Sequence, residues 1–338
     1  MKTAVTGIKP TGTPHLGNYL GMYRPALELA RDHMAFYFIA DYHALTVEAR
    51  PEVRRELSHQ VAATSLALGL DPSRAVLYRQ SDLPEVCELA WILACITPKG
   101  LLNRGHAYKA VRDANLASGR DADIGVNVGL FNYPVLMAAD VLIMQADAVP
   151  VGQDQQQHVE ILRDVAAAFN RRYGRLLTLP EAAIDSRVAT IPGLDGQKMS
   201  KSYGNVIPIF AQPAELRRLV LRIRTDSRTP DEPKDPDTDP VFSLYRHVAD
   251  ADAAGTLLRR YEAGGVGYAE AKELLVEALE AALGEPRRRY GEALRDHGLL
   301  EAVLTEGAAQ ARERAAPLLR AVREAVGLSP APAHPPTR

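Results

Sequence analysis

The sequence is short of cysteine and of long apolar runs, and each shortage excludes a class of protein. Its 338 residues include only two cysteines, Cys87 and Cys95, without the paired short spacings of a zinc site. We therefore expect no bound zinc, and we expect both thiols to be inert core residues. No apolar run approaches the roughly 20 residues of a spanning helix, and the first residues lack the features of a secretion signal. We expect a cytoplasmic protein with no membrane partner.

An excess of charge of either sign is also absent. Lys and Arg number 40 against 42 Asp and Glu, which gives a formal net charge of −2. A nucleic-acid partner would have to be held by local basic patches rather than by the field of the whole chain. The Walker loop and the Gly-x-Gly-x-x-Gly signature are missing as well, so the usual nucleotide-binding folds lack support.

The first two thirds of the chain alternate short β-rich runs with amphipathic helical patterns. Strands are predicted at 3–6, 35–39 and 75–78, and helices over 16–32 and 51–69. This alternation is typical of α/β proteins and predicts a Rossmann-like, doubly wound parallel sheet in a catalytic domain over residues 1–205.

Three further segments differ from this pattern. Residues 100–125 form a polar, basic, glycine-containing stretch too long for an ordinary connection, which predicts a mobile lid-like insertion. Residues 206–328 predict an all-helical domain, with helices at 214–224, 242–249, 253–261, 268–283 and 286–296. The tail at 329–338 contains four prolines and is expected to be disordered.

The first segment that carries chemistry, residues 11–18, reads Thr-Gly-Thr-Pro-His-Leu-Gly-Asn and follows the first strand. Thr13 is suited to cap the next helix, which would place His15 and Asn18 at a helix N-terminus. Such an end can hold a phosphate, and Gly12 and Gly17 would let a nucleotide approach closely. On the octapeptide alone, a capped helix without a ligand is the simpler interpretation.

The second segment, residues 196–202, reads Gly-Gln-Lys-Met-Ser-Lys-Ser and forms a loop, here called the KMSKS loop. Two ammonium groups on a loop can follow the charge that builds on transferring phosphoryl oxygens. The alternative is a solvated lysine pair without a role.

The two segments, in this order, resemble the His-(Ile/Leu)-Gly-(His/Asn) and Lys-Met-Ser-Lys-Ser signatures of class I aminoacyl-tRNA synthetases. Residues 131–142 and 149–155 resemble the tryptophan-specific members, and the likeness extends from Lys2 past residue 300. It implies a homodimeric tryptophan–tRNA ligase that uses ATP with Mg²⁺, L-tryptophan and tRNA(Trp), with anticodon recognition by the helical domain.

The resemblance also assigns site residues. Catalysis falls to Lys198, Lys201 and His15. ATP binding falls to residues from both motifs and the 149–155 region: Lys9, Pro10, Thr11, Gly17, Asn18, Gly152, Gln153, Asp154, Lys198, Met199, Ser200, Lys201 and Ser202. Tryptophan binding falls to Asp140, Tyr133, Met137, Gln155 and His43. No residue is assigned to a metal.

Some of these assignments have plainer alternatives. Asp140 lies in an apolar helix, where an unpaired carboxylate would cost several kcal/mol. Its partner is either an arginine or helix cap in the core, or a substrate N–H such as the indole nitrogen, which the resemblance favours. Asp154 could simply cap a helix, and His43 could be structural.

Basic residues of the helical half are candidate phosphate contacts, although on helices they more often form a solvated face. They are Arg217, Arg218, Arg222, Arg224 and Arg287 to Arg289.

The chain also departs from many bacterial members of the tryptophan family, since it has Val5 and Lys9 for Phe and Gln, and Ala107 for Gln. These residues resemble another branch of that family, so we expect variation within tryptophan specificity. The other hypotheses are a tyrosine-specific synthetase of the same architecture and a non-catalytic paralogue that binds tRNA or protein.

Overall fold

A parallel five-stranded sheet with the order β3-β2-β1-β4-β5 forms the centre of the computed structural model, which describes residues 1–46, 50–152, 156–184 and 191–329. The strands are β1 (Thr3–Ile8), β2 (Met34–Ile39), β3 (Ala75–Arg79), β4 (Ala148–Pro150) and β5 (Glu181–Ala183). β1 and β2 pair in register from Thr3 opposite Met34 to Ile8 opposite Ile39. The predicted Rossmann-like fold class is confirmed.

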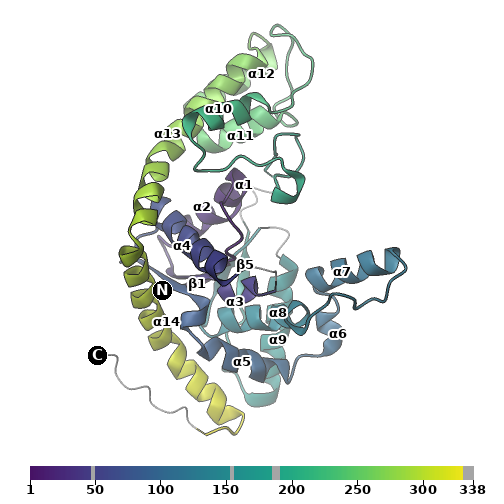
Figure 1. Ribbon diagram of the computed structural model, residues 1–338, viewed down its shortest axis with the longest axis vertical. Helices are drawn as coiled ribbons and strands as arrows, with labels where there is room; N and C mark the ends of the chain where they lie inside the picture. Colours follow the sequence, from purple (N-terminus) through teal and green to yellow (C-terminus); the bar gives the residue numbers. More distant parts are fainter. Residues whose placement is uncertain (47–49, 153–155, 185–190, 330–338) are drawn as a thin grey trace.

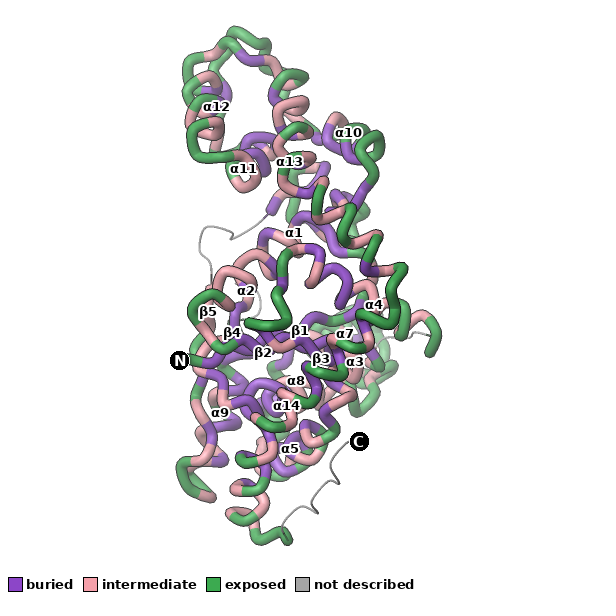
Figure 2. Tube along the Cα trace, turned by 90° about the vertical axis from the view of Figure 1, so that its left-hand side faces the viewer, coloured by how far each residue is buried: buried purple, intermediate pink, exposed green. Residues whose placement is uncertain are grey.

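Helices cover both faces of the sheet. Successive side chains of a strand point to opposite faces, and in these strands the side chains on both faces are largely apolar, so each face must be buried. Val5, Phe36 and Tyr78 pack with α5 (Glu85–Ala94), α8 (Val128–Leu142) and α9 (Gln156–Tyr173). Tyr37 and Leu77 pack on the other side with α2 (Arg24–Leu29) and α4 (Pro51–Ala67). Figure 2 shows this buried layer along the sheet and its flanking helices.

The stretch predicted as a lid is largely helical. It contains α6 (Lys99–Leu102) and α7 (His106–Ala117), and α7 extends away from the body of the domain (Figure 1). Alanine, leucine, lysine and arginine in α7 are good helix formers, and their intrinsic preference outweighs the irregular pattern.

A helical unit contains α10 (Pro213–Leu221), α11 (Pro240–Val248), α12 (Ala251–Ala263) and the first part of α13 (Tyr268–Arg295), and its core is continuous with Leu16 and Leu20 after β1. The prediction of two helices at 268–283 and 286–296 is wrong, since α13 is continuous through Pro286. An interior proline costs a helix about 3 kcal/mol. Buried leucines on α13, including Leu275, Leu279 and Leu283, offset that cost through packing.

The last helix, α14 (His297–Ala325), corrects the expected extent of the helical domain. It packs against β3 and places Ala308, Ala311 and Ala315 in the core of the sheet domain rather than in the helical unit. The segment 206–328 is therefore not one independent body. The chain leaves the sheet domain, forms the helical unit and returns along α13 and α14, as Figure 1 shows.

The prediction that Cys87 and Cys95 are core thiols is wrong, because both are exposed on or just after α5. Trp91, between them in the sequence, has 73% of its surface exposed. The apolar residues of α5 form one buried face of the helix. Cys87, Trp91 and Cys95 follow one another at four-residue spacing, so they share the opposite, exposed face. Within the described residues, no helix is long and apolar enough to cross a membrane.

One close contact makes the packing of α14 testable. A Cβ added to Gly307 would lie 1.9 Å from the Leu77 carbonyl oxygen in β3. We expect Gly307→Ala to lower the free energy of unfolding by about 1–3 kcal/mol or more, because the backbone of a strand cannot move aside cheaply. Urea denaturation measures the change.

Gly284→Ala is the matched control, since its nearest atom would be the flexible end of Glu280 at 3.8 Å. Alanine there should be neutral or add up to about 1 kcal/mol through helix propensity. Equal effects of the two substitutions would contradict the close packing of α14 on the sheet.

Candidate active site

A cleft of about 890 Å³ lies at the carboxyl edge of the sheet, where ligands bind in open α/β folds. Its walls come from the end of β1 and the residues after it, from the segment after β2, and from the end of β4. Gly7 is required there, because a Cβ would lie 2.4 Å from the ring of Phe38. The volume is within the usual range for small-molecule sites.

The two motif segments meet at this cleft. The ammonium group of Lys201 donates to the carbonyl oxygen of Thr11 at 3.0 Å, and the N–H of Gly17 lies 3.3 Å from the sulfur of Met199. The Leu16 N–H donates to the Ile207 carbonyl at 2.8 Å. Residues as far apart in the sequence as Thr11 and Lys201, 190 positions, therefore form one wall.

Asn205, which the sequence analysis did not select, holds the shape of the KMSKS loop. Its side chain is buried, accepts from the Ser200 N–H at 2.8 Å and donates to the Lys198 carbonyl at 3.1 Å. It also donates to Asp195 at 2.7 Å. A buried amide three residues after a polar loop is a recognisable signal, but its partners become visible only in the fold.

Most residues assigned to ATP line the cleft: Lys9, Gly17, Asn18, Gly152, Lys198, Met199 and Ser200, together with the catalytic candidate His15. Of the other described residues in that group, Pro10, Thr11, Lys201 and Ser202 lie outside the lining. Thr11 and Lys201 are nevertheless joined to each other beside it. Gln153, Asp154 and Gln155 lie outside the described residues.

His15, rather than Thr13, is the N-cap of the helix that follows β1. Helix α1 (Leu16–Asn18) begins after it, and the His15 N–H donates to the side chain of Asn18 at 3.1 Å. The imidazole is 8% exposed, and its Nδ1 has no hydrogen-bond partner among the described residues. Burial, followed by the positive charge of Lys201, lowers the pKa of His15 to about 4. The ring is therefore neutral at pH 7 and offers hydrogen bonds rather than charge.

Asp140 does not line the cleft, but three other residues assigned to tryptophan lie together at its far end. His43, Tyr133 and Met137 line it, together with Phe38 and Val141. The Tyr133 hydroxyl lies 2.7 Å from Nε2 of His158, and the rings of Tyr133 and His43 meet edge to face at 6.4 Å. His158 and Phe38 were not predicted as site residues.

Asp140 is 1% exposed on α8, as its apolar surroundings predicted. Its carboxylate accepts from Gln80 Nε2 at 2.7 and 2.8 Å and lies 2.9 Å from His43 Nε2. The arginine or helix cap of the alternative interpretation is not among these partners, which are an amide and an imidazole. Burial raises the pKa of Asp140, and the hydrogen bonds from His43 and Gln80 oppose that shift.

Gln80 also was not predicted, although its position carries a signal. It directly follows β3, so it lies at the same sheet edge as the other site residues, and it is fully buried. A buried amide at the carboxyl end of a parallel strand needs partners. The fold supplies Asp140 and the backbone N–H of Tyr42, which donates to Gln80 at 3.1 Å.

The lid-like segment reaches the cleft through Ala107, the position of one family departure. The ring of His106 beside it lies 5.6 Å from that of His158. The beginning of α7 therefore adjoins the part of the cleft lined by Tyr133 and His158.

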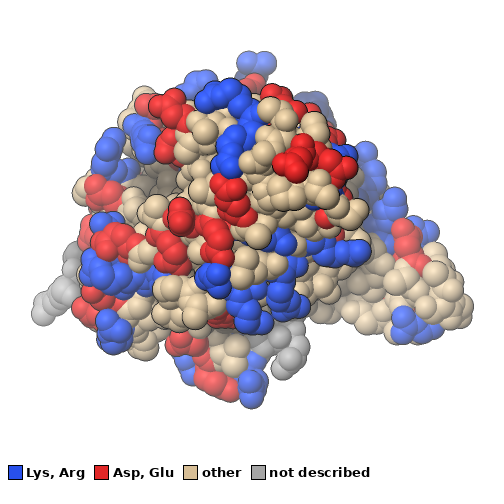
Figure 3. All heavy atoms as spheres, turned by 90° about the horizontal axis from the view of Figure 1, so that it is seen from above, with Lys and Arg blue, Asp and Glu red and all other residues tan. Residues whose placement is uncertain are grey.

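Several candidate basic residues are already paired within the helical unit. Arg217 bonds Glu273, Arg287 bonds Glu280, and Arg288 and Arg289 both bond Glu285. Arg218 lies 4.0 Å from Glu215, and Arg222 and Arg224 are exposed. Figure 3 shows Lys and Arg mixed with Asp and Glu on this side of the molecule. This pattern favours the solvated-face interpretation for the paired arginines.

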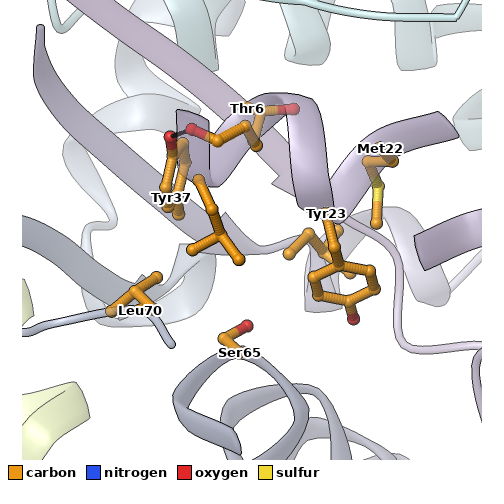
Figure 4. Close-up of a pocket in the computed structure, with 9 residues that line it drawn as sticks. Thr6, Met22, Tyr23, Tyr37, Ser65 and Leu70 are labelled. Carbon is orange, nitrogen blue, oxygen red and sulfur yellow. Dashed lines mark hydrogen bonds between the residues drawn. The ribbon is translucent and has the colours of Figure 1, made fainter. Parts of the chain in front are cut away.

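A second pocket lies between β1, β2, α2 and α4 and is shown in Figure 4. It is lined mainly by apolar side chains, including Tyr23, Tyr37 and Leu70. Its volume of about 10 Å³ leaves room for about one water molecule. The large cleft is therefore the candidate active site.

Comparisons with known proteins agree with this geometry. The model of the family described as "tRNA synthetases class I (W and Y)" matches residues 1–284. A tryptophan–tRNA ligase of Bordetella parapertussis is 52% identical over 97% of this chain and 74% of its own length. One from Neisseria meningitidis is 48% identical over 97% and 98%, respectively.

Solved structures give the same result. A tryptophanyl-tRNA synthetase from Campylobacter jejuni, complexed with ADP and tryptophan, has a TM-score of 0.84 and 41% identity over 96% of this chain and all of that chain. The tyrosyl-tRNA synthetase of Archaeoglobus fulgidus, with a TM-score of 0.66 and 22% identity, shares the fold. The chain belongs to the class I tRNA synthetases of the W and Y family.

Proposed function

We propose that this protein is a tryptophan–tRNA ligase, which activates L-tryptophan with ATP and transfers it to the 3′ end of tRNA(Trp). The observation that carries the proposal is the single cleft that joins the KMSKS loop, the 11–18 loop and the Asp140 cluster. Relatives near 50% identity with this name support it. Pyrophosphate exchange, run separately with tryptophan and tyrosine, tests it against the tyrosine-specific and non-catalytic alternatives.

In the proposed reaction, ATP and tryptophan bind at opposite ends of the cleft and react where they meet. The carboxylate of tryptophan attacks the α-phosphorus of ATP, the bond to the β-phosphate oxygen breaks, and pyrophosphate leaves. A terminal ribose hydroxyl of the tRNA then attacks the adenylate carbonyl, and AMP leaves. ATP would arrive as its Mg²⁺ complex, in which the ion neutralises phosphate charge.

We assign the phosphates to the wall formed by the two motif segments. Lys198 faces the cleft and Lys201 lies beside it on Thr11, so their charges can stabilise the phosphates as they separate. His15 contributes as a neutral hydrogen-bonding group. Pro10, Met199, Ser200 and Ser202 would shape this wall, with Gly152, Gln153 and Asp154 at the nucleoside.

We assign the indole to the end lined by His43, Tyr133 and Met137, with Gln155 and Tyr133 serving the amino-acid head group. A carboxylate has about four acceptor positions. Three of those on Asp140 are used by Gln80 and His43. The position that remains can accept the indole N–H.

Partners beyond the small substrates follow from the same proposal. The helical unit around α10–α12 would contact the anticodon region of tRNA(Trp), in the cytoplasm. A second copy of the chain would cover the exposed face of α5. Trp91, 73% exposed beside two exposed cysteines, supports a homodimer there, since aromatic residues are enriched at such interfaces.

Replacing either lysine of the KMSKS loop tests the phosphate assignment. We expect Lys198→Ala and Lys201→Ala to lower the rate of tryptophan activation by about 10²-fold or more, with tryptophan affinity nearly unchanged. The two ammonium groups stabilise charge mainly in the transition state, when the phosphates separate, so their removal should lower kcat rather than substrate affinity. Single-turnover adenylate formation and tryptophan binding are measured separately, with Lys2→Ala as the distant control. Equal losses in rate and in tryptophan affinity would refute the assignment.

Asp140→Asn tests the indole acceptor, because it keeps the volume but replaces an acceptor oxygen by a donor. We expect kcat/KM for tryptophan to fall by about 10²-fold or more and the preference over phenylalanine to shrink, since that preference depends on the acceptor. The control is Asp239→Asn, a second buried aspartate that caps α11. It should reduce stability and leave the preference unchanged. The same outcome for Asp140→Asn would mean a structural role only.

The low pKa of His15 predicts a dependence of stability on pH. The folded value is about 4 and the unfolded value about 6.5, so the unfolded chain takes up the proton first. Stability linked to the neutral ring is present above pH 6.5 and is lost as the pH falls toward 4, by up to about 3 kcal/mol. We expect His15→Gln to lose less stability over this interval in urea denaturation. If the free energy of unfolding changed with pH in the same way in both proteins, His15 would not be a buried, neutral ring.

A further inference from the structure

A second group of titratable side chains lies at the junction of α4 and α14, apart from the residues that line the cleft. Each helix contributes one carboxylate and one imidazole. Glu56 and His59 are three apart on α4, and His297 and Glu301 are four apart on α14. These spacings place each pair on one face of its helix.

The two pairs face each other. One ligand atom from each of Glu56, His59 and His297 lies within 4.8 Å of the other two. Nε2 of His59 lies 2.7 Å from Glu301, and the ring centroids of His59 and His297 are 4.6 Å apart. Four side chains from two helices therefore converge on one small volume.

The surrounding structure fixes this arrangement. Arg79, at the end of β3, makes two hydrogen bonds to Glu301, at 2.8 and 2.7 Å. Asp296 caps α14 by accepting the N–H of Leu299 at 2.9 Å, which places His297 at the first position of the helix. The ligand side chains are thus presented by rigid elements.

We propose that Glu56, His59 and His297, supported by Glu301, bind one Zn²⁺ ion that fastens α14 to α4. Two imidazoles and a carboxylate suit zinc, whereas magnesium and calcium prefer oxygen ligands alone. In a tetrahedral zinc site, bonds near 2.0–2.1 Å place ligand atoms roughly 3.3 Å apart. Glu56 and His297 are exposed, so rotation of their side chains can close the set.

Glu301 supports the zinc site whichever ring nitrogen of His59 binds the ion. If zinc binds Nδ1, Glu301 accepts the N–H of Nε2 and orients the ring, as carboxylates do around zinc-bound histidines. If zinc binds Nε2, the Glu301 carboxylate is near enough to become a fourth ligand. The prediction of no bound zinc rested on cysteine spacing, and this ligand set contains no cysteine.

The position of the site gives the ion a structural effect. α13 ends at Arg295 and α14 starts at His297, so the site lies at the joint between the two helices, whose residues Ala293 and Leu300 both pack in the core of the sheet domain. A metal bond between α14 and α4 restrains this joint. Binding to the folded protein alone also raises its stability.

The test uses the full-length, tag-free protein, stripped with a chelator and titrated with Zn²⁺ by calorimetry. We expect one tight site per chain and an increase in the thermal unfolding midpoint of about 2 °C or more with zinc. His297→Ala and Glu56→Gln, at exposed positions, should each weaken zinc binding at least about 10-fold and abolish the thermal shift. His33→Ala, outside the cluster, is the control and should behave as the unmodified chain.

The metal-free unfolding midpoint of each variant shows whether it is folded, so loss of binding can be separated from loss of structure. Unchanged zinc affinity in folded His297→Ala and Glu56→Gln would overturn the proposal, because any bound zinc would then lie elsewhere. Absence of a tight site, or an unfolding midpoint that zinc does not move in the unmodified chain, would overturn it as well.

Discussion

The parallel pairing of β1 between β2 and β4 is the constraint on which the rest of the structure depends. Parallel strands end at one edge of the sheet and need a crossover between them. The segments that follow β1, β2 and β4 therefore meet at the cleft. Helices on both faces are equally required, because a parallel sheet is stable only when both sides are covered.

Within that frame, the two ends of the cleft differ chemically. The end formed by the two motif segments is polar and built from loops, whereas the other end is more apolar and rests on α8, where Asp140 is held by Gln80 and His43. A buried acceptor discriminates against ligands that lack a donor, because they leave it without a partner. In the proposed function, the cluster would link the cost of burying a charge to the choice of amino acid.

The return of the chain through α13 and α14 joins the two parts of the molecule. α13 carries the core of the helical unit, and α14 packs closely on β3, with Gly307 against Leu77. The proposed zinc cluster lies at the turn between these helices. A helical unit tied to the sheet by packing and by a metal ion has a defined position relative to the cleft.

The sequence by itself predicted the parallel fold class and three of its strands, β1 to β3, because alternation of β-rich runs and amphipathic helices is local information. β4 and β5, of three residues each, were not predicted. The sequence also determined the two motif loops, whose residue types and order carry their chemistry, and the burial of Asp140, whose neighbours in α8 are apolar. The helical structure of α7 also follows from local information, namely the helix preference of its residues, although its irregular pattern led to the prediction of a lid-like insertion.

Only the tertiary structure decided which distant residues meet. Gln80 and Asp140 are 60 positions apart, and His59 and Glu301 are 242 apart. No local pattern encodes such contacts, since they depend on how helices pack across the sheet. The same reason explains the continuous α13 and the exposed cysteines of the α5 segment, because packing energy, rather than local propensity, decides whether a proline is tolerated or an apolar face is covered.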